Sequence, residues 1–252
     1  MKVLTIKNYA IILLTFFAAI SITSCSEDHD HGGTGHLHVY FSNRYGLTDP
    51  LEYDSVKTGT NGRDFTFQTN QYYISNARLV THDGTEVPTD AYLLVKNGLE
   101  NEIEFEEVAA GHYTALRFDV GIDSATNHLD PSTYDGTSPL ALQTPSMHWS
   151  WNSGYIFFRL EGLVDTSAAK TGTVDAPWEM HLGTDASLVS VELPIDVAVT
   201  AESHPGVNVY LNSAALLIGI DLGGADISTH TMDNMPLANK LKANIATAFT
   251  VE

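Results

Sequence analysis

The strongest constraint on the fold is a series of short runs in which apolar and polar residues alternate and turn residues separate the runs. In residues 64–87, DFTFQTNQYYISNARLVTHDGTEV, the alternation leads into Asp83-Gly84, a dipeptide typical of tight hairpins. Many short strands without helical periodicity between them predict an all-β fold, an antiparallel β-sandwich or barrel. Further β-rich runs, each bounded by Gly, Pro, Asn or Asp, occupy residues 91–98, 103–123, 154–162, 187–200 and 207–224.

The C-terminal residues depart from this pattern. In NMPLANKLKANIATAFTVE, Leu237, Leu241, Ile245 and Phe249 recur every four residues, which is one apolar stripe of an amphipathic helix. We predict a short C-terminal helix that packs across an open end of the sheet. No internal repeat or change of composition indicates a second domain, so residues 36–252 are predicted to form one β-rich domain.

The N-terminal residues have the pattern of a secretory signal. Lys2 and Lys7 precede an apolar run over residues 9–20, which is too short to span a bilayer as a helix. The run ends in Ile-Thr-Ser-Cys, which resembles a bacterial lipobox, and Cys25 is the only cysteine in the chain. We predict that residues 1–24 are a lipoprotein signal peptide and that Cys25 is lipidated; the alternative is a plain signal peptide with an incidental cysteine.

The predicted export, the net charge and the cysteine count together exclude some classes of protein. Residues 1–24 contain two lysines and no acid, so their removal changes the net charge from −19 to −21 and leaves 228 residues. That length is enough for one domain with a substantial core, and a chain with one cysteine has no internal disulfide to stabilise it. So acidic a chain is not expected to bind nucleic acid, but it attracts cations. We expect an extracytoplasmic protein anchored to the outer membrane, on its periplasmic or its surface face.

A polar, acidic and glycine-containing segment follows the cysteine. Residues 25–35 are predicted to be a flexible tether between the lipid and the domain. A histidine-rich tract can bind transition metals weakly, but we interpret His29 and His31 as solvated linker residues. His36 and His38 stand where the first strand begins, so they are expected to be held more firmly.

Enzymatic chemistry is not indicated, and the chain is predicted not to be an enzyme. It has no G-x-S-x-G and no second cysteine, and DLGGAD at residues 221–226 lacks the lysine and the following helix of a phosphate-binding loop. One acidic segment offers oxygen ligands for calcium but lacks EF-hand spacing, so we interpret it as turns that cap their own backbone. Its oxygen-bearing residues are Asp119, Asp123, Asn127, Asp130 and Asp135.

Two aromatic segments contain the candidate metal ligands. In MHWSW, an extended backbone puts Met147, Trp149 and Trp151 on one face and His148 on the other. The residues alone favour a buried Trp/Met face with the histidine at the surface, because large aromatic side chains are usually buried.

The second segment, PWEMHLG at residues 177–183, repeats tryptophan, methionine and histidine in another order, with Trp178, Met180 and His181. Thioether and imidazole ligands beside aromatic rings suit copper, whereas hard cations prefer carboxylates.

Several segments, in order, resemble the MbnP-like family of methanobactin-associated periplasmic copper proteins. They are YYISNARL at 72–79, an AYLLV strand, AAGHYTALRFDVGIDSATN at 109–127, MHWSWNSGYIFFRLEG, and MHLG at 180–183. The resemblance implies a secreted or surface-anchored β-rich protein that in some relatives binds copper through histidines. In relatives with a copper site, a tryptophan oxidised to kynurenine joins the coordination. A partner di-haem enzyme of the cytochrome c peroxidase type is associated with that oxidation.

The resemblance and the residue types together give a candidate site. Trp149 and Trp151 match the tryptophan motif of the family and are the candidate kynurenines, and His181 matches its H-L-G motif. His148, where relatives often have an aromatic residue, is added as a ligand on our own inference, as is His38 on the first strand. Relatives often place the first-strand histidine slightly later, where this chain has asparagine.

Such a site would use two imidazoles and the aryl amine of kynurenine, a low-coordinate arrangement suited to Cu(I). Each ligating histidine is expected to bind a carboxylate or carbonyl through its other nitrogen, and Glu179 and Asp185 are the candidates near in sequence. We therefore predict a lipid-anchored copper-binding protein. The alternatives are a β-sandwich interaction module without metal, and a protein that serves mainly as the substrate of a haem peroxidase.

Overall fold

The computed structural model describes residues 33–97, 99, 101–149, 154–224 and 226–252. The predicted signal peptide, Cys25, most of the predicted tether and Trp151 lie outside the described residues. Gly32–Glu252 forms one compact unit. Within the described ranges, no helix combines the length and apolar character needed to cross a bilayer.

The described residues form mainly strands. Their bounds are β1 (Thr34–Tyr45), β2 (Asp49–Pro50), β3 (Lys57–Thr58), β4 (Asp64–Phe65), β5 (Thr69–Thr81), β6 (Glu86–Pro88), β7 (Leu93–Val95), β8 (Glu102–Ala109), β9 (Gly111–Val120), β10 (Ile156–Val164), β11 (Ala176–Gly183), β12 (Val189–Val199), β13 (Gly206–Asn212), β14 (Ser228–Thr229) and β15 (Phe249–Val251). The helices are α1 (Ser124–Asn127), α2 (Ser213–Leu216) and α3 (Met235–Ile245), with short 3-10 turns at Pro131–Thr133 and Asp185–Ser187. Strand β1 begins inside the segment that the sequence predicts to be tether.

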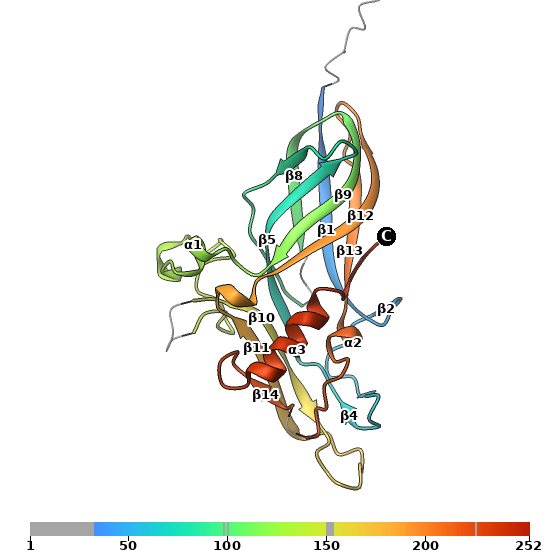
Figure 1. Ribbon diagram of the computed structural model, residues 1–252, viewed down its shortest axis with the longest axis vertical. Helices are drawn as coiled ribbons and strands as arrows, with labels where there is room; N and C mark the ends of the chain where they lie inside the picture. Colours follow the sequence, from blue (N-terminus) through green and yellow to red (C-terminus); the bar gives the residue numbers. More distant parts are fainter. Residues whose placement is uncertain (1–32, 98, 100, 150–153, 225) are drawn as a thin grey trace, which may run out of the picture. The chain divides into compact units, whose positions relative to one another are not determined.

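The strands make two sheets (Figure 1). Sheet A has the order β15-β13-β1-β2, with β8 also paired to β1. Sheet B has the order β12-β9-β5-β10-β11-β14, and the short strands β3, β4, β6 and β7 attach to it. Most pairs are antiparallel, which confirms the predicted fold class, whereas β1–β13 and β11–β14 are parallel.

The alternation in the sequence produces the two faces of each strand, because successive side chains of a strand point to opposite sides. In β1, Leu37, Val39 and Phe41 are buried, and the residues between them are more exposed. The predicted hairpin is confirmed, since β5 and β6 pair in antiparallel register around it, with Leu79 opposite Val87.

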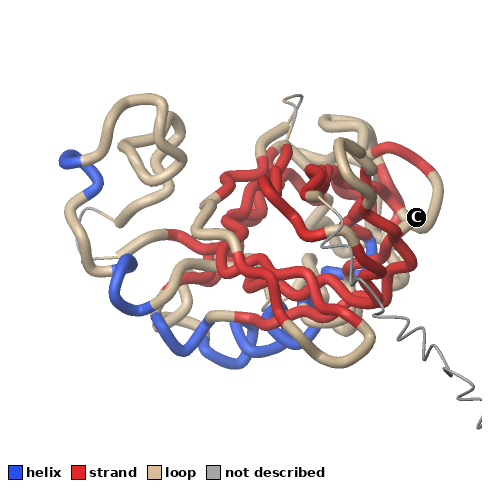
Figure 2. The backbone as a smooth tube through the Cα atoms, turned by 90° about the horizontal axis from the view of Figure 1, so that it is seen from above, coloured by secondary structure: helices blue, strands red, loops and turns tan. Residues whose placement is uncertain are grey.

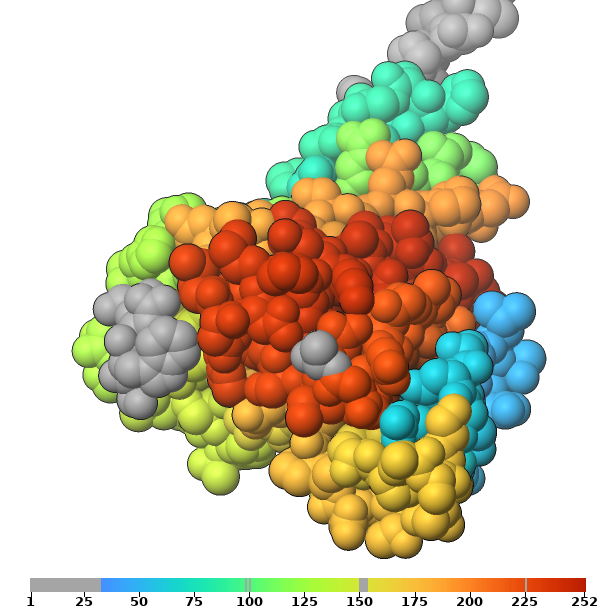
Figure 3. Space-filling view, turned by 60° about the horizontal axis from the view of Figure 1, so that its bottom comes forward, coloured from blue at the N-terminus to red at the C-terminus, as the bar shows by residue number. Residues whose placement is uncertain are grey.

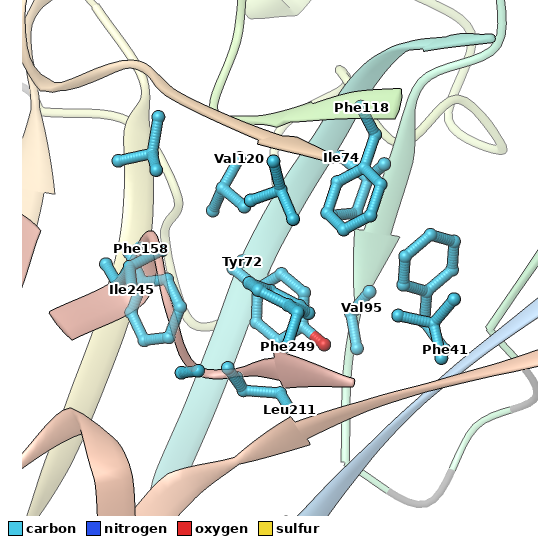
Figure 4. Packing of buried hydrophobic residues seen from close by; sticks show 14 of the residues in the cluster. Phe41, Tyr72, Ile74, Val95, Phe118, Val120, Phe158, Leu211, Ile245 and Phe249 are labelled. Atoms are coloured by element: carbon cyan, nitrogen blue, oxygen red, sulfur yellow. The ribbon is translucent and has the colours of Figure 1, made fainter. Parts of the chain in front are cut away.

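Aromatic side chains from both sheets fill the core between them. Phe118 of β9 meets Phe41 of β1 edge to face at 5.4 Å between ring centroids, and meets Phe249 of β15 at 5.2 Å. Tyr72 of β5 stacks on Phe158 of β10 at 5.2 Å. Figure 4 shows these rings together with aliphatic residues, and Figure 2 shows from above that the strands are curled. Such pairs each add about 0.5–1.5 kcal/mol beyond the burial of their area.

Helix α3 packs on sheet B beside β11 and β14 (Figure 1). The C-terminal residues, red in Figure 3, cover the middle of the face seen there. Leu237, Leu241 and Ile245 are buried, as the predicted stripe requires. The helix ends at Ile245, however, and Phe249 belongs to β15, where it gains backbone pairing with β13 and a place among the core rings.

Helix α3 has an N-cap that also fixes the residues before it. The side chain of Asn234 accepts a hydrogen bond from the backbone N–H of Leu237 at 3.3 Å and donates one to the carbonyl of Ser228 at 3.2 Å. Replacing Asn234 with alanine is expected to lower the free energy of unfolding by about 1 kcal/mol. Thermal denaturation should show a fall in Tm of roughly 2–4 °C. The control is Asn239→Ala, an exposed position of the same helix, which should not destabilise the protein because alanine is the better helix former.

Candidate metal centre

The candidate centre lies on the outer face of sheet B, where β10 and β11 pair. In β11, Trp178, Met180 and Leu182 point into the core and are 1%, 0% and 1% exposed. Alternation therefore turns Glu179 and His181 to the opposite face. Sequence proximity grouped Met180 with His181, but the structure separates the thioether from the imidazole, since Met180 belongs to the core. Met147 is likewise buried, in a second apolar cluster.

Pairing between β10 and β11 supplies the immediate partners of His181. Arg159 stands opposite His181, and Glu161 opposite Glu179. The imidazole Nε2 of His181 lies 2.8 Å from Oε1 of Glu161, which also accepts a hydrogen bond from Nε of Arg159 at 2.8 Å. Only 6% of His181 is exposed, so the ring is held between the strands and its carboxylate partner.

A turn from a distant part of the chain completes the centre. Strand β14 pairs in parallel with β11, and His230 follows it directly. Thr231 fastens this turn to β11, because its Oγ1 donates to the carbonyl of His181 at 3.0 Å and accepts from the N–H of Gly183 at 3.0 Å. Thr231 has φ +68°, and this pair of hydrogen bonds stabilises the uncommon conformation.

Both ring nitrogens of His230 face carboxylates. Its Nδ1 lies 2.9 Å from Oδ2 of Asp233, and its Nε2 lies 3.4 Å from Oε1 of Glu179. Asp233 also accepts from the backbone N–H of His230 at 2.6 Å. The pKa of Asp233 is lowered, because hydrogen bonds from His230 outweigh the effect of burial.

The three side chains Glu179, His181 and His230 form one ligand group. One ligand atom from each lies within 4.8 Å of the others, and the two imidazole centroids are 5.1 Å apart at an interplanar angle of 81°. A carboxylate on one ring nitrogen holds the proton there and leaves the other nitrogen to coordinate. Glu161 acts in this way on His181, and Asp233 on His230. Two oriented imidazoles and a carboxylate suit a borderline transition metal.

Trp149 lies beside this group. Its ring packs on Gly183, two residues beyond His181 on the same face of β11, because a Cβ added to Gly183 would stand 2.3 Å from ring atoms Cη2 and Cζ3. Same-face positions of a strand are roughly 7 Å apart. Trp149 is 5% exposed and borders a cavity of about 300 Å³, whose other lining residues include His128 and Asp185.

The structure places the other predicted ligands elsewhere. His148 bridges to Tyr155, its ring meets the tyrosine edge to face at 5.2 Å, and its Nε2 accepts from the N–H of Gly154 at 3.3 Å. Burial lowers the pKa of His148. Among the described residues, the ligand group around His181 does not include His148.

His38 lies on β1 of sheet A, where its ring nitrogen Nδ1 meets Glu102. It is therefore on a different sheet from His181, because the first strand pairs with β13 and β8 rather than with β11.

The two predicted outer-shell carboxylates also differ in position. Glu179 is part of the ligand group and contacts His230. Asp185 instead accepts hydrogen bonds from Ser124 and from Asn127, the latter at 2.8 Å, and lies 3.2 Å from His128. These hydrogen bonds lower the pKa of Asp185. The outer-shell position that we expected for Asp185 is taken by Glu161, which the sequence offers only as the end of a strand.

The half-buried carboxylate of Glu161 is expected to make the stability of the fold depend on pH. Burial raises the pKa of Glu161, but the hydrogen bonds of His181 and Arg159 outweigh it and bring the pKa to about 2, from 4.5. A depressed carboxyl pKa stabilises the fold fully above the unfolded value, and the contribution is lost as pH falls from 4.5 to about 2. Urea unfolding of metal-free protein should show this loss, of order 3 kcal/mol. Glu161→Gln should flatten the profile in this window, and an unchanged profile would contradict the assignment.

Comparison with known proteins agrees with this architecture. No curated protein matches the sequence. The structure of MbnP from Methylosinus trichosporium superposes with a TM-score of 0.60 at 14% identity, over 86% of this chain and 98% of that one, and so shares the fold. The family model of MbnP matches residues 34–236, which is most of the chain. That match includes β1, the aromatic segment around Trp149, the pair β10–β11 and the turn containing His230. The chain belongs to the MbnP family.

Proposed function

We propose that the protein is an extracytoplasmic copper-binding protein whose ion is held by His181 and His230, with Glu179 beside them. The observation that carries the proposal is the ligand group itself, in which an atom from each of these residues lies within 4.8 Å of the others. Each imidazole has a carboxylate on its second nitrogen, the arrangement that orients histidine ligands in metal proteins.

The donor set fits copper. Imidazole is a good ligand for copper, and among first-row divalent metal ions Cu²⁺ generally binds a given site most tightly. The two histidines suffice for Cu(I), and the carboxylate of Glu179 provides an oxygen donor for Cu(II). Copper here is cargo that the protein acquires, stores or passes on. The net charge of −19 favours approach of the cation from solution.

Trp149 is the residue that we propose to be oxidised to kynurenine. Its ring lies against Gly183, next to His181 on the same face, so an aryl amine formed there would add a nitrogen donor near the two imidazoles. The proposed oxidant is hydrogen peroxide used by a di-haem partner of the cytochrome c peroxidase type. Two peroxides deliver one oxygen atom each across the indole C2–C3 bond and leave two waters. Hydrolysis then releases formate and leaves the amine.

We also propose that Cys25 carries a lipid and anchors the protein to the outer membrane. The support is its position after an apolar run and an Ile-Thr-Ser sequence, followed by a polar segment before β1. Metabolic labelling with a fatty acid should mark the wild-type protein and not Cys25→Ser. Label that persists in the variant would contradict lipidation at this cysteine.

The test of copper binding is an anaerobic Cu(I) titration against a chromophoric chelator. The protein used is the chain from residue 26, which contains the complete compact unit Gly32–Glu252. We expect one tightly bound equivalent that persists when His29 and His31 are both replaced by alanine and that requires His230. If the tight equivalent disappears with His29 and His31, copper binds the tether and the proposal fails. Intact mass before and after exposure to the peroxidase tests oxidation at Trp149.

A further inference from the structure

A second group of histidines lies on the outer face of sheet A. His36 and His38 are alternate residues of β1, and Leu37 between them is buried, so both rings stand on the same outer face. His204, from the turn between β12 and β13, joins them. The ring centroids of His36 and His204 are 4.9 Å apart and stacked, and those of His38 and His204 are 6.0 Å apart.

The register of the sheet fixes His204 in this position. Strands β1 and β13 are parallel, with His38 opposite Gly206, and the turn continues this pairing. The backbone N–H of His36 donates to the carbonyl of Ser203 at 2.8 Å, and that of His38 to the carbonyl of Pro205 at 3.0 Å. His204 therefore lies between two backbone hydrogen bonds to β1.

A glycine permits this close approach. A Cβ on Gly35 would stand 2.6 Å from the carbonyl oxygen of Thr200 and 2.8 Å from that of Ser203. Contacts below 3.0 Å are essentially never seen for real Cβ atoms, so a larger residue would push the turn away from β1.

Two carboxylates of β8 orient the rings of β1. Nδ1 of His36 lies 2.6 Å from Oε1 of Glu104, and Nδ1 of His38 meets Oε1 of Glu102. In both pairs the carboxylate engages Nδ1, which holds the proton on that nitrogen and leaves the lone pair on Nε2. The His36 and His38 side chains are 39% and 20% exposed, so an ion from solution can reach them.

We propose that His36, His38 and His204 form a second metal site, for a borderline divalent ion such as Zn²⁺. Three imidazoles, two of them oriented by carboxylates, are the donor set of zinc sites that keep a fourth position for water. The rings of His36 and His38 lie 4.9 and 6.0 Å from that of His204, so binding of one ion requires these partly exposed side chains to turn toward one another. The site belongs to sheet A, whereas Glu179, His181 and His230 belong to sheet B and its adjoining turn, so the two sites are independent.

The test is a Zn²⁺ titration against a chromophoric chelator at neutral pH, using the chain from residue 26 with His29 and His31 replaced by alanine. In the same background, His181→Ala removes the site on sheet B and should leave one equivalent bound. Adding His204→Ala should abolish that equivalent. Glu104→Gln should weaken it about 10- to 100-fold, the usual effect of removing an outer-shell partner. The matched control is His112→Ala, which removes an exposed histidine paired with Asp196 and should change nothing.

His204 lies in an exposed turn, and circular dichroism of each variant reports whether the fold is intact. Zinc that remains bound in the folded His204→Ala protein would overturn the proposal, as would the absence of any zinc in the His181→Ala background. Tight copper binding that persists in His181→Ala, with zinc still bound through His204, would contradict the proposed function alone.

Discussion

Replacing His181 with alanine is expected to remove the tightly bound Cu(I). The variant loses one of two imidazoles and leaves His230 and Glu179, which lie 3.4 Å apart, without their opposite ligand. Removing an outer-shell partner already costs about 10- to 100-fold in affinity, so loss of a direct ligand should exceed about 100-fold. Competition against a Cu(I) chelator measures the change.

The control for this experiment is His128→Ala. His128 lies 3.2 Å from Asp185 and borders the cavity next to Trp149, but it is outside the ligand group. The affinity of the His128→Ala protein for Cu(I) should equal that of the wild type. Equal affinity of the His181→Ala protein, in a chain that also lacks His29 and His31, would refute copper binding at this centre.

Replacing Gly183 with alanine is expected to displace Trp149. The added Cβ would stand 2.3 Å from two ring atoms and 2.5 Å from the carbonyl oxygen of Tyr155. The ring of Trp149 belongs to a packed apolar cluster, and the oxygen of Tyr155 belongs to the backbone. Moving either of them therefore costs packing or hydrogen-bond energy. We expect destabilisation of about 3 kcal/mol, toward the upper end for overpacked cores. The corresponding fall in Tm is roughly 6–12 °C.

Two readouts distinguish displacement of Trp149 from general destabilisation. Tryptophan emission should shift to longer wavelength as the indole becomes exposed, and peroxidase treatment should no longer give the kynurenine mass at this residue. Gly136→Ala is the control, because a Cβ there meets no atom within 4 Å. Unchanged Tm and emission in Gly183→Ala would show that Trp149 does not pack on β11.

The fold was largely predictable from the sequence because local alternation encodes which residues of a strand are buried. Leu37, Val39 and Phe41 illustrate this in β1. Alternation does not encode which strands pair. The parallel neighbour of β1 is β13, more than 150 residues later in the chain, and the resulting cluster of His36 and His204 could not be anticipated. Phe249 had helical spacing, but strand pairing with β13 decided its conformation.

The candidate centre was predictable in part. The sequence singled out His181 by its motif, and Glu179 by its nearness in sequence, but as an outer-shell residue rather than as a ligand. His230 was missed, since β14 has two residues and gives no periodic signal, and its approach to β11 depends on tertiary pairing. Met180 adjoins His181 in sequence, yet alternation puts the two on opposite faces. The pattern H-x-M-D in residues 230–233, next to an N-capped helix, was the local signal available.

The parallel contact of β14 with β11 is short, and β15 is shorter than the strand it joins, so few backbone bonds attach the last residues to the sheets. An ion shared by His181 and His230 would act as a removable cross-link between the sheet and this C-terminal segment. Binding to the folded form alone adds stability that grows with the free ion concentration. Local opening of the C-terminal segment would then become rarer, and amide exchange there slower, whenever the ion is present. The metal-loaded protein would therefore be cleaved by proteases more slowly than the metal-free protein.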